Sequence, residues 1–164
     1  MTKIGILSDT HNEHHSTQQA LATFRRRGVD TLFHCGDLAA PDMVQHFAGF
    51  ETYFARGNMD RHQKHAIRAA IDALPGAHWL GKGDEITLAG KRIALTHGDK
   101  AEVLETLLFA EPDYLFCGHT HRRRDERIGP TRVVNPGALG GTRHEARSVA
   151  ILDLERDVLE VVYV

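Results

Sequence analysis

The chain alternates short apolar runs with segments whose apolar residues recur at helical spacing. Apolar runs bounded by turn-forming residues predict strands, and helical spacing of apolar positions predicts amphipathic helices. The segment 16–27, for example, brings Ala20, Leu21 and Phe24 to one face and is followed by Gly28, a favourable C-cap. The predicted helices are 16–27, 41–47, 61–74 and 101–109. The predicted strands are 3–7, 31–34, 52–55, 78–80, 85–88, 92–96, 114–117, 131–134, 148–154 and 158–164.

The order of these elements predicts the class of fold. The first half of the chain alternates strand and helix, whereas the second half is mostly strand. This order favours an α/β protein in which two sheets pack face to face and helices cover the outside. The sequence has no repeat, low-complexity tract or linker, so we expect residues 1–164 to form one domain.

The composition indicates that the protein can fold without disulfide bonds or structural metal ions. A hydrophobic content of 41% supports a sizeable core, and a net charge of −2 gives no sign of broad attraction to nucleic acid or membranes. No apolar stretch approaches the roughly 20 residues of a membrane span, and the N-terminus lacks the apolar core of a signal peptide. We therefore expect a cytoplasmic protein with no membrane partner. Cys35 and Cys117 each end an apolar run and are expected to be buried and reduced, although neighbouring strand ends would also allow them to pair.

Five short polar motifs each follow a predicted strand. They are Ser8-Asp9-Thr10-His11, Cys35-Gly36-Asp37, Gly57-Asn58-Met59-Asp60, Thr96-His97-Gly98 and Gly118-His119-Thr120-His121. In open α/β sheets, binding sites lie beyond the carboxyl ends of the strands, which is where each motif falls. One such motif alone is a weak signal, because a Gly-Asp pair is usually a turn and a His-x-His pair usually lies at the surface. All five in order, each at a strand end, indicate one shared site.

The residue types in these motifs indicate metal ions. Aspartate, asparagine and histidine supply the oxygen and nitrogen ligands that borderline divalent metals prefer. Two carboxylates, one amide and four imidazoles exceed what one metal normally uses, whereas two metals that share a bridging carboxylate would use them all. A metal pair about 3.5–4 Å apart suits in-line displacement at phosphorus. The motifs therefore predict a reaction as well as a ligand.

With these motifs in this order, the chain resembles the calcineurin-like metallophosphoesterases, in particular the small single-domain bacterial and archaeal phosphodiesterases. The resemblance spans nearly the whole chain. It implies a four-layer α/β/β/α sandwich of two mixed sheets flanked by helices. It also implies a dinuclear-metal-dependent phosphodiesterase, in which a metal-bridging hydroxide attacks phosphorus in line.

The resemblance further implies a role for each motif residue. One metal is expected on Asp9, His11, Asp37 and His121. The second metal is expected on Asp37, Asn58, His97 and His119, which are also the expected catalytic residues, and Asp37 would bridge the two ions. We expect manganese, with nickel, iron and zinc as alternatives.

Five further residues are expected to support the ligands or contact the substrate. Asp60 is expected to accept a proton from a ligand histidine ring. Asn135 and Gly137 belong to a turn that the resemblance places near the site, where the glycine permits close backbone approach. Arg56 and Arg143 lie close to motifs and are the expected phosphate contacts.

The basic run Arg122-Arg123-Arg124, together with Arg127, follows the last histidine pair. One interpretation is an anion clamp for phosphorylated substrates. The other, which we favour, is a solvated loop.

Met59 is the departure from the family pattern with most mechanistic weight. Many larger members carry histidine after the asparagine and use it to protonate the leaving group. Met59 cannot donate this proton, so substrates with good leaving groups should be favoured.

The same residue leaves a second function open, because it is also compatible with lost catalysis. The retromer subunit of this superfamily keeps the fold and serves mainly as a scaffold, so the alternative is a non-catalytic scaffold or binding module. The complete ligand set favours the enzyme. A nuclease is a third interpretation, which the near-neutral charge and the single Trp79 argue against. We expect a small phosphorylated substrate and no long nucleic acid, and the sequence leaves a homo-oligomer open.

Overall fold

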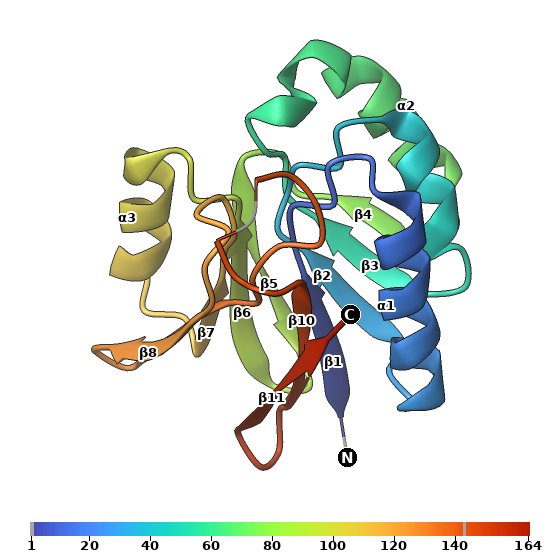
Figure 1. The fold of residues 1–164 in the computed structure, drawn as a ribbon. Helices are drawn as coiled ribbons and strands as arrows, with labels where there is room; N and C mark the ends of the chain where they lie inside the picture. Colours follow the sequence, from blue (N-terminus) through green and yellow to red (C-terminus); the bar gives the residue numbers. More distant parts are fainter. Residues whose placement is uncertain (1, 143) are drawn as a thin grey trace.

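The computed structural model describes residues 2–142 and 144–164, whose strands form two sheets (Figure 1). The first sheet has the strand order β11 (Val158–Tyr163), β10 (Ser148–Asp153), β1 (Lys3–Leu7), β2 (Thr31–His34), β3 (Glu51–Phe54) and β4 (Ala77–Trp79). The second sheet has the order β5 (Gly83–Leu88), β6 (Lys91–Thr96), β7 (Tyr114–Phe116), β9 (Thr131–Asn135) and β8 (Arg124–Ile128). The helices are α1 (His14–Arg26), α2 (Lys64–Ala73) and α3 (Ala101–Phe109), with the 3-10 helices η1 (Pro41–Phe47) and η2 (Met59–Gln63).

Both sheets combine parallel and antiparallel pairs. In the first sheet β1, β2, β3 and β4 run parallel, while β10 and β11 run antiparallel beside β1. In the second sheet β6, β7 and β9 run parallel, and β5 and β8 form antiparallel edges. The prediction of two mixed sheets is therefore confirmed.

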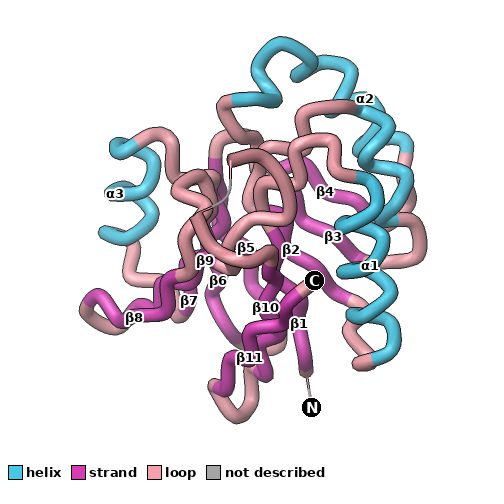
Figure 2. The backbone as a smooth tube through the Cα atoms, in the orientation of Figure 1, coloured by secondary structure: helices cyan, strands magenta, loops and turns pink. Residues whose placement is uncertain are grey.

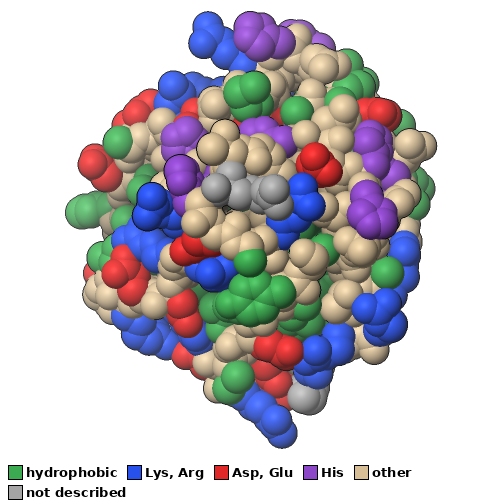
Figure 3. All heavy atoms as spheres, viewed as in Figure 1, with side chains coloured by type: hydrophobic (Ala, Val, Ile, Leu, Met, Phe, Trp, Pro, Cys, Tyr) green, Lys and Arg blue, Asp and Glu red, His purple; other side chains and the backbone are tan. Residues whose placement is uncertain are grey.

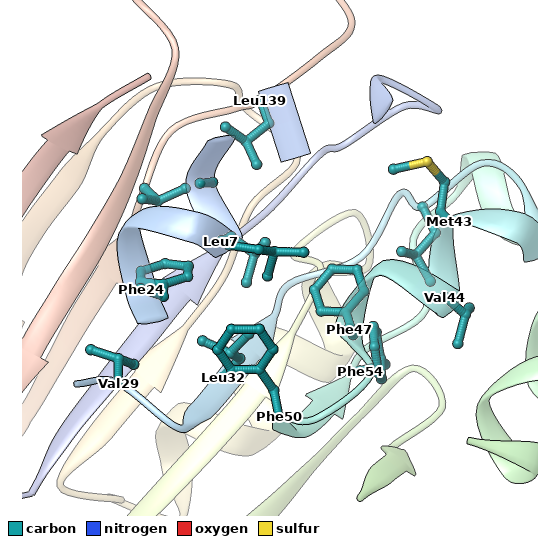
Figure 4. Packing of buried hydrophobic residues seen from close by; sticks show 14 of the residues in the cluster. Leu7, Phe24, Val29, Leu32, Met43, Val44, Phe47, Phe50, Phe54 and Leu139 are labelled. Carbon is teal, nitrogen blue, oxygen red and sulfur yellow. The ribbon is translucent and has the colours of Figure 1, made fainter. Parts of the chain in front are cut away.

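The layers are held together by three groups of buried side chains. The largest lies between the first sheet and the helices α1, η1 and α2, and includes Phe24, Phe47 and Phe54 (Figure 4). A second group fills the space between the sheets, where the rings of Phe33 and Phe116 meet edge to face at 5.2 Å. A third group joins the second sheet to half-buried leucines of α3. Figure 2 shows the same arrangement, with strands between outer helices, so the predicted four-layer α/β/β/α sandwich is confirmed.

The main errors of the sequence-based prediction lie at polar segments. The predicted helix 61–74 is divided between η2 and α2, and the helix predicted at 41–47 is the 3-10 helix η1. The strand β8 was not predicted, because its sequence RDERI is charged and mostly exposed, as suits an edge strand. Cys35 and Cys117 are buried and free, as predicted. None of the helices among the described residues has the length and apolar character needed to cross a membrane.

Candidate metal centre

The five polar motifs follow β1, β2, β3, β6 and β7, and the loops that carry them gather at the carboxyl ends of these strands (Figure 2). Both sheets contribute, so residues distant in sequence become neighbours. Hydrogen bonds join the loops. The Asp9 N–H donates to the Gly36 carbonyl at 3.0 Å, and the His119 N–H donates to Asp9 Oδ2 at 3.1 Å. Histidine side chains are visible in the upper part of the molecule, above the strands (Figure 3).

The backbone at the predicted ligands is strained. Positive φ values, which favour glycine, occur at Asp9 (54°), His11 (44°), Asp37 (61°), His119 (70°) and His121 (55°). Each such conformation in a residue with a side chain costs on the order of 1–3 kcal/mol and persists only where the surroundings enforce it. Strain at five of the seven predicted ligands is an observation that points to function.

A first group of donors contains Asp9, His11 and His121. Asp9 Oδ1 lies 3.1 Å from His121 Nε2 and 3.5 Å from His11 Nε2, and the two Nε2 atoms are 3.2 Å apart. A metal with bonds of about 2.0–2.1 Å and angles near 90–110° holds its ligands about 2.8–3.4 Å apart. The His121 Nδ1–H donates to the Thr142 carbonyl, which leaves Nε2 as the free donor atom. These spacings fit a metal ion.

A second group contains Asp37, Asn58, His97 and His119. His97 Nε2 lies 3.3 Å from Asp37 Oδ2 and 3.1 Å from Asn58 Oδ1, which is also 3.1 Å from His119 Nδ1. The carbonyl of Cys35 can only accept, so His97 Nδ1 donates to it at 2.7 Å and Nε2 is free for a metal. This group has the same spacing as the first.

Two carboxylates connect the groups. Asp37 Oδ2 is 3.3 Å from His97 and 3.6 Å from His11, so it faces both groups, as the predicted bridge requires. Asp9 Oδ1 also reaches toward His97, at 3.9 Å. Each carboxylate has its other oxygen occupied: Asp37 Oδ1 accepts from the Met59 N–H at 2.8 Å, and Asp9 Oδ2 from the Ser8 hydroxyl at 2.5 Å.

The charges of the site also fit cation binding. Burial by itself raises the pKa of Asp9, but contacts with the rings of His11 and His121 outweigh it and hold this pKa far below its usual range. Burial by itself lowers the pKa of His97, but Asp37 and Asp9 outweigh it and raise this pKa to about 9. Ionised carboxylates at the centre of the site thus demand positive charge, which a divalent ion would supply in place of protons.

Asp60 has a different role from the one predicted. Among residues 2–142 and 144–164 it accepts no hydrogen bond from a histidine ring. Its carboxylate accepts three backbone N–H groups instead, from Asp37 at 3.0 Å, Gly57 at 2.8 Å and Ala39 at 2.8 Å. It therefore ties the loop after β2 to the loop after β3. The histidine partners are main-chain carbonyls instead, those of Cys35 and Thr142, and a sequence gives no signal for such contacts.

Asn135 and Gly137 support the loop that carries His119 and His121. Asn135 Nδ2 donates to the Gly118 carbonyl at 2.9 Å and to Thr120 Oγ1 at 3.1 Å, and Asn135 Oδ1 accepts from the Gly137 N–H at 3.0 Å. Gly137 has φ of 89°, and a Cβ there would lie 2.4 Å from the Ser148 hydroxyl oxygen. The close approach expected of this glycine is therefore toward β10.

The predicted arginine contacts have different surroundings. Arg56 is half-buried and lines a groove with Asn58, whereas Arg143 lies outside the described residues. In the basic run, Arg123 pairs with Glu145 at 3.5 Å, Arg124 with Glu126, and Arg127 with Asp157 at 2.5 Å. These ion pairs argue against an anion clamp. The interpretation that we favoured, a solvated loop, is wrong for Arg124 and Arg127, because both residues belong to the strand β8.

Comparison with known proteins defines the class. The family model of the calcineurin-like phosphoesterase superfamily domain matches residues 2–157, and the chain belongs to this family. It is a metal-dependent phosphoester hydrolase, and the family implies divalent metal ions. Among the described residues, the candidates to hold them are Asp9 with His11 and His121, and Asp9 with Asp37 and His97.

Among individual proteins, the chain is similar to a phosphodiesterase of Methanocaldococcus jannaschii, with 27% identity over 94% of each chain. A solved structure described as a novel archaeal phosphodiesterase superposes with a TM-score of 0.91 at 25% identity, covering 99% of this chain and 100% of that one. The zinc complex of Vps29 from Entamoeba histolytica has a TM-score of 0.63 at 18% identity, covering 99% and 98%, and that likeness concerns the fold alone.

Proposed function

We propose that the protein is a phosphodiesterase that uses two divalent metal ions, manganese first among them, and acts on small phosphorylated substrates. The observation that carries the proposal is the pair of donor groups joined by Asp37 and Asp9. One site would use Asp9, His11, Asp37 and His121, and the other Asp37, Asn58, His97 and His119. A cytoplasmic location and the absence of a long nucleic-acid partner stay predictions.

When bound, the ions would supply a water activated at neutral pH and positive charge for the phosphoryl oxygens. The chain itself fixes the direction of each ligand. His97 and His121 keep their Nδ1 protons on main-chain carbonyls, so that Nε2 faces the site. Asn58 adds an oxygen without charge, and its place at the rim leaves it accessible to a phosphate oxygen.

The chain supplies no acid at the position where larger relatives carry histidine. Met59 is half-exposed there, with 50% of its surface accessible, and its thioether cannot donate a proton. The leaving group would therefore depart as an anion or take its proton from water. Diesters with an acidic leaving group, such as p-nitrophenyl diesters, should therefore be hydrolysed faster than alkyl monoesters, whose leaving groups are poor.

The test is hydrolysis of bis-p-nitrophenyl phosphate by metal-stripped protein after addition of manganese, nickel, iron or zinc. His119→Ala is the informative variant, because His119 is exposed and its loss removes a ligand without opening the core. We expect this variant to lose at least about 100-fold in hydrolysis and to melt in chelator like the parent. His65→Ala, an exposed histidine of α2, is the matched control and should keep the parent rate.

The same experiment separates the enzyme from a scaffold. A scaffold depends on surface shape, which the loss of one exposed imidazole leaves nearly intact. Parent protein that hydrolyses no phosphodiester or phosphomonoester with any of these metals would contradict the proposed function and favour the scaffold.

A further inference from the structure

A groove of about 250 Å³ opens next to the second donor group. Its lining residues define what we call the basic groove: Arg56, Gly57, Asn58, Arg61, Lys82, Asp99 and Lys100. The lining comes from both sheets, through the loop after β3 with η2 and the loops before β5 and α3. Asn58 belongs to the groove and also to the donor group, so the groove begins where a substrate phosphate would be bound.

The cations of the groove have no ion-pair partner in the part of the chain that the structure describes. Four cationic side chains face one carboxylate there, in a chain whose net charge is −2. No ion pair joins Arg56, Arg61, Lys82 or Lys100 to a carboxylate within the described residues.

Arginines elsewhere in the second sheet behave differently. Arg132 on β9 pairs with Asp125 at 2.8 Å and with Asp157 at 2.7 Å, and Arg92 on β6 pairs with Glu85 at 2.7 Å. Unpaired cations gathered beside a phosphoester site therefore indicate an anionic ligand.

We propose that the basic groove binds a second, terminal phosphate of the substrate. The physiological substrate would then be a small phosphodiester that also carries a phosphate monoester. A monoester phosphate has a charge of about −1.5 to −2 at pH 7, so it gains more from several cations than a second diester would. The inference rests on the proposed phosphodiesterase function, because it takes the scissile phosphate to lie beside Asn58.

A small ligand fits better than a nucleic-acid strand. The volume of the groove suits one phosphate group with part of its carrier. A strand would need basic side chains that continue along its path. The basic run after His121 does not provide them, because Arg123, Arg124 and Arg127 are paired with acidic side chains.

Two substrates that differ by one phosphate test the proposal: the p-nitrophenyl ester of thymidine 5′-phosphate, and the same ester with a 3′-phosphate. We expect the metal-loaded protein to prefer the second by about tenfold or more in kcat/KM, a difference of about 1.4 kcal/mol. Arg61→Ala and Lys82→Ala should each reduce this preference about twofold to fivefold, and the double variant should reduce it further. Arg156→Ala, an exposed arginine in the turn before β11, should keep the parent preference.

A binding measurement keeps the inference independent of turnover. ¹⁵N-labelled, metal-free protein, which cannot hydrolyse them, is titrated separately with the same two esters, with and without the 3′-phosphate. The amide signals of Arg61, Lys82 and Lys100 should shift at a lower concentration of the ester with the 3′-phosphate, and in the double variant the signal of Lys100 should no longer show this difference.

The outcomes distinguish the two proposals. Equal kcat/KM for the two esters, or equal titration curves, would overturn the phosphate subsite while hydrolysis itself still supported the phosphodiesterase. Tighter binding of an oligothymidylate without terminal phosphates would also overturn it and indicate a nucleic-acid strand. Hydrolysis of neither ester, with the 3′-phosphorylated ester still preferred in the titration, would reject the enzyme and keep the subsite.

Discussion

Main-chain groups, more than other side chains, set the direction of the candidate ligands. Carbonyls of Cys35 and Thr142 hold the rings of His97 and His121, and the N–H groups of Met59 and His119 occupy one oxygen each of Asp37 and Asp9. The positive φ values at Asp9, His11, Asp37, His119 and His121 are the structural cost of this arrangement.

The pKa of His97 makes metal binding depend on pH. Despite burial, Asp37 and Asp9 raise this pKa from 6.5 to about 9, and a ring that binds a metal must be unprotonated. We expect the Mn²⁺ affinity of metal-free protein to rise between pH 6.5 and 9, by up to about tenfold per pH unit.

Stability in chelator should follow the opposite trend. A folded-state pKa above the ordinary value stabilises the metal-free protein below pH 6.5, and this contribution is lost as the pH rises through 9. For the affinity prediction, calorimetric titration with Mn²⁺ in buffers of different ionisation enthalpy measures the proton that metal binding releases. An affinity that is constant over this range would show that His97 carries no proton for the metal to displace.

Met59 should limit the range of leaving groups. Replacing it by histidine places an acid beside Asn58, and general acid catalysis typically contributes about 100- to 10,000-fold. Met59→His should therefore raise the rate on alkyl phosphodiesters and leave p-nitrophenyl esters, whose leaving group is already acidic, nearly unchanged. Rates on the two classes are compared by the release of the alcohol from alkyl phosphodiesters and of p-nitrophenolate from p-nitrophenyl esters. Equal parent rates on alkyl and p-nitrophenyl esters would mean that another residue already donates the proton.

The strands and helices that position the site were largely predictable, because they depend on apolar patterns that survive in the sequence. Strands such as β1 and β2 are buried on both faces and read as apolar runs. The strand β8 was not predicted, because its position at the edge of the sheet leaves its charged side chains in solvent, so its sequence has no apolar pattern. The predicted ligands lie close together in the structure, whereas the contacts of Asp60 with three N–H groups depend on loop geometry, which residue types do not encode.

His34, at the end of β2, is a buried titratable residue that contacts the loops after β1 and β2. It is fully buried against Phe47 and Phe54, accepts from the Gly36 N–H at Nδ1, and lies 3.2 Å from the Thr10 hydroxyl. Burial lowers its pKa from 6.5 to about 3. The unfolded chain therefore binds a proton that the folded chain excludes between these two values.

Stability in chelator should consequently fall as the pH drops below 6.5 toward 3, with His34 contributing up to about 1.4 kcal/mol per pH unit. His34→Gln cannot take up this proton, so its stability should depend less on pH over the same range. Urea unfolding at pH 7 and pH 5 compares the two proteins. The same loss in parent and variant would assign the pH dependence to other groups.

At the scale of the whole molecule, the fold brings the ends of strands from both sheets to one site. The first sheet contributes Asp9, His11, Asp37 and Asn58, and the second contributes His97, His119 and His121. Aromatic packing between the sheets, as at Phe33 and Phe116, fixes the distance between these contributions. Each donor group combines residues from both sheets, so an intact sandwich is a condition for either metal site.

The central claim is that two ions act together, and a metal titration tests it most directly. Metal-free protein receives increasing Mn²⁺ while bound metal is measured by elemental analysis and bis-p-nitrophenyl phosphate hydrolysis is followed in the same samples. We predict that activity reaches its maximum only as the second ion per chain is bound, because the donors form two groups that share carboxylates. Full activity with one bound ion per chain, or none with two, would contradict the account.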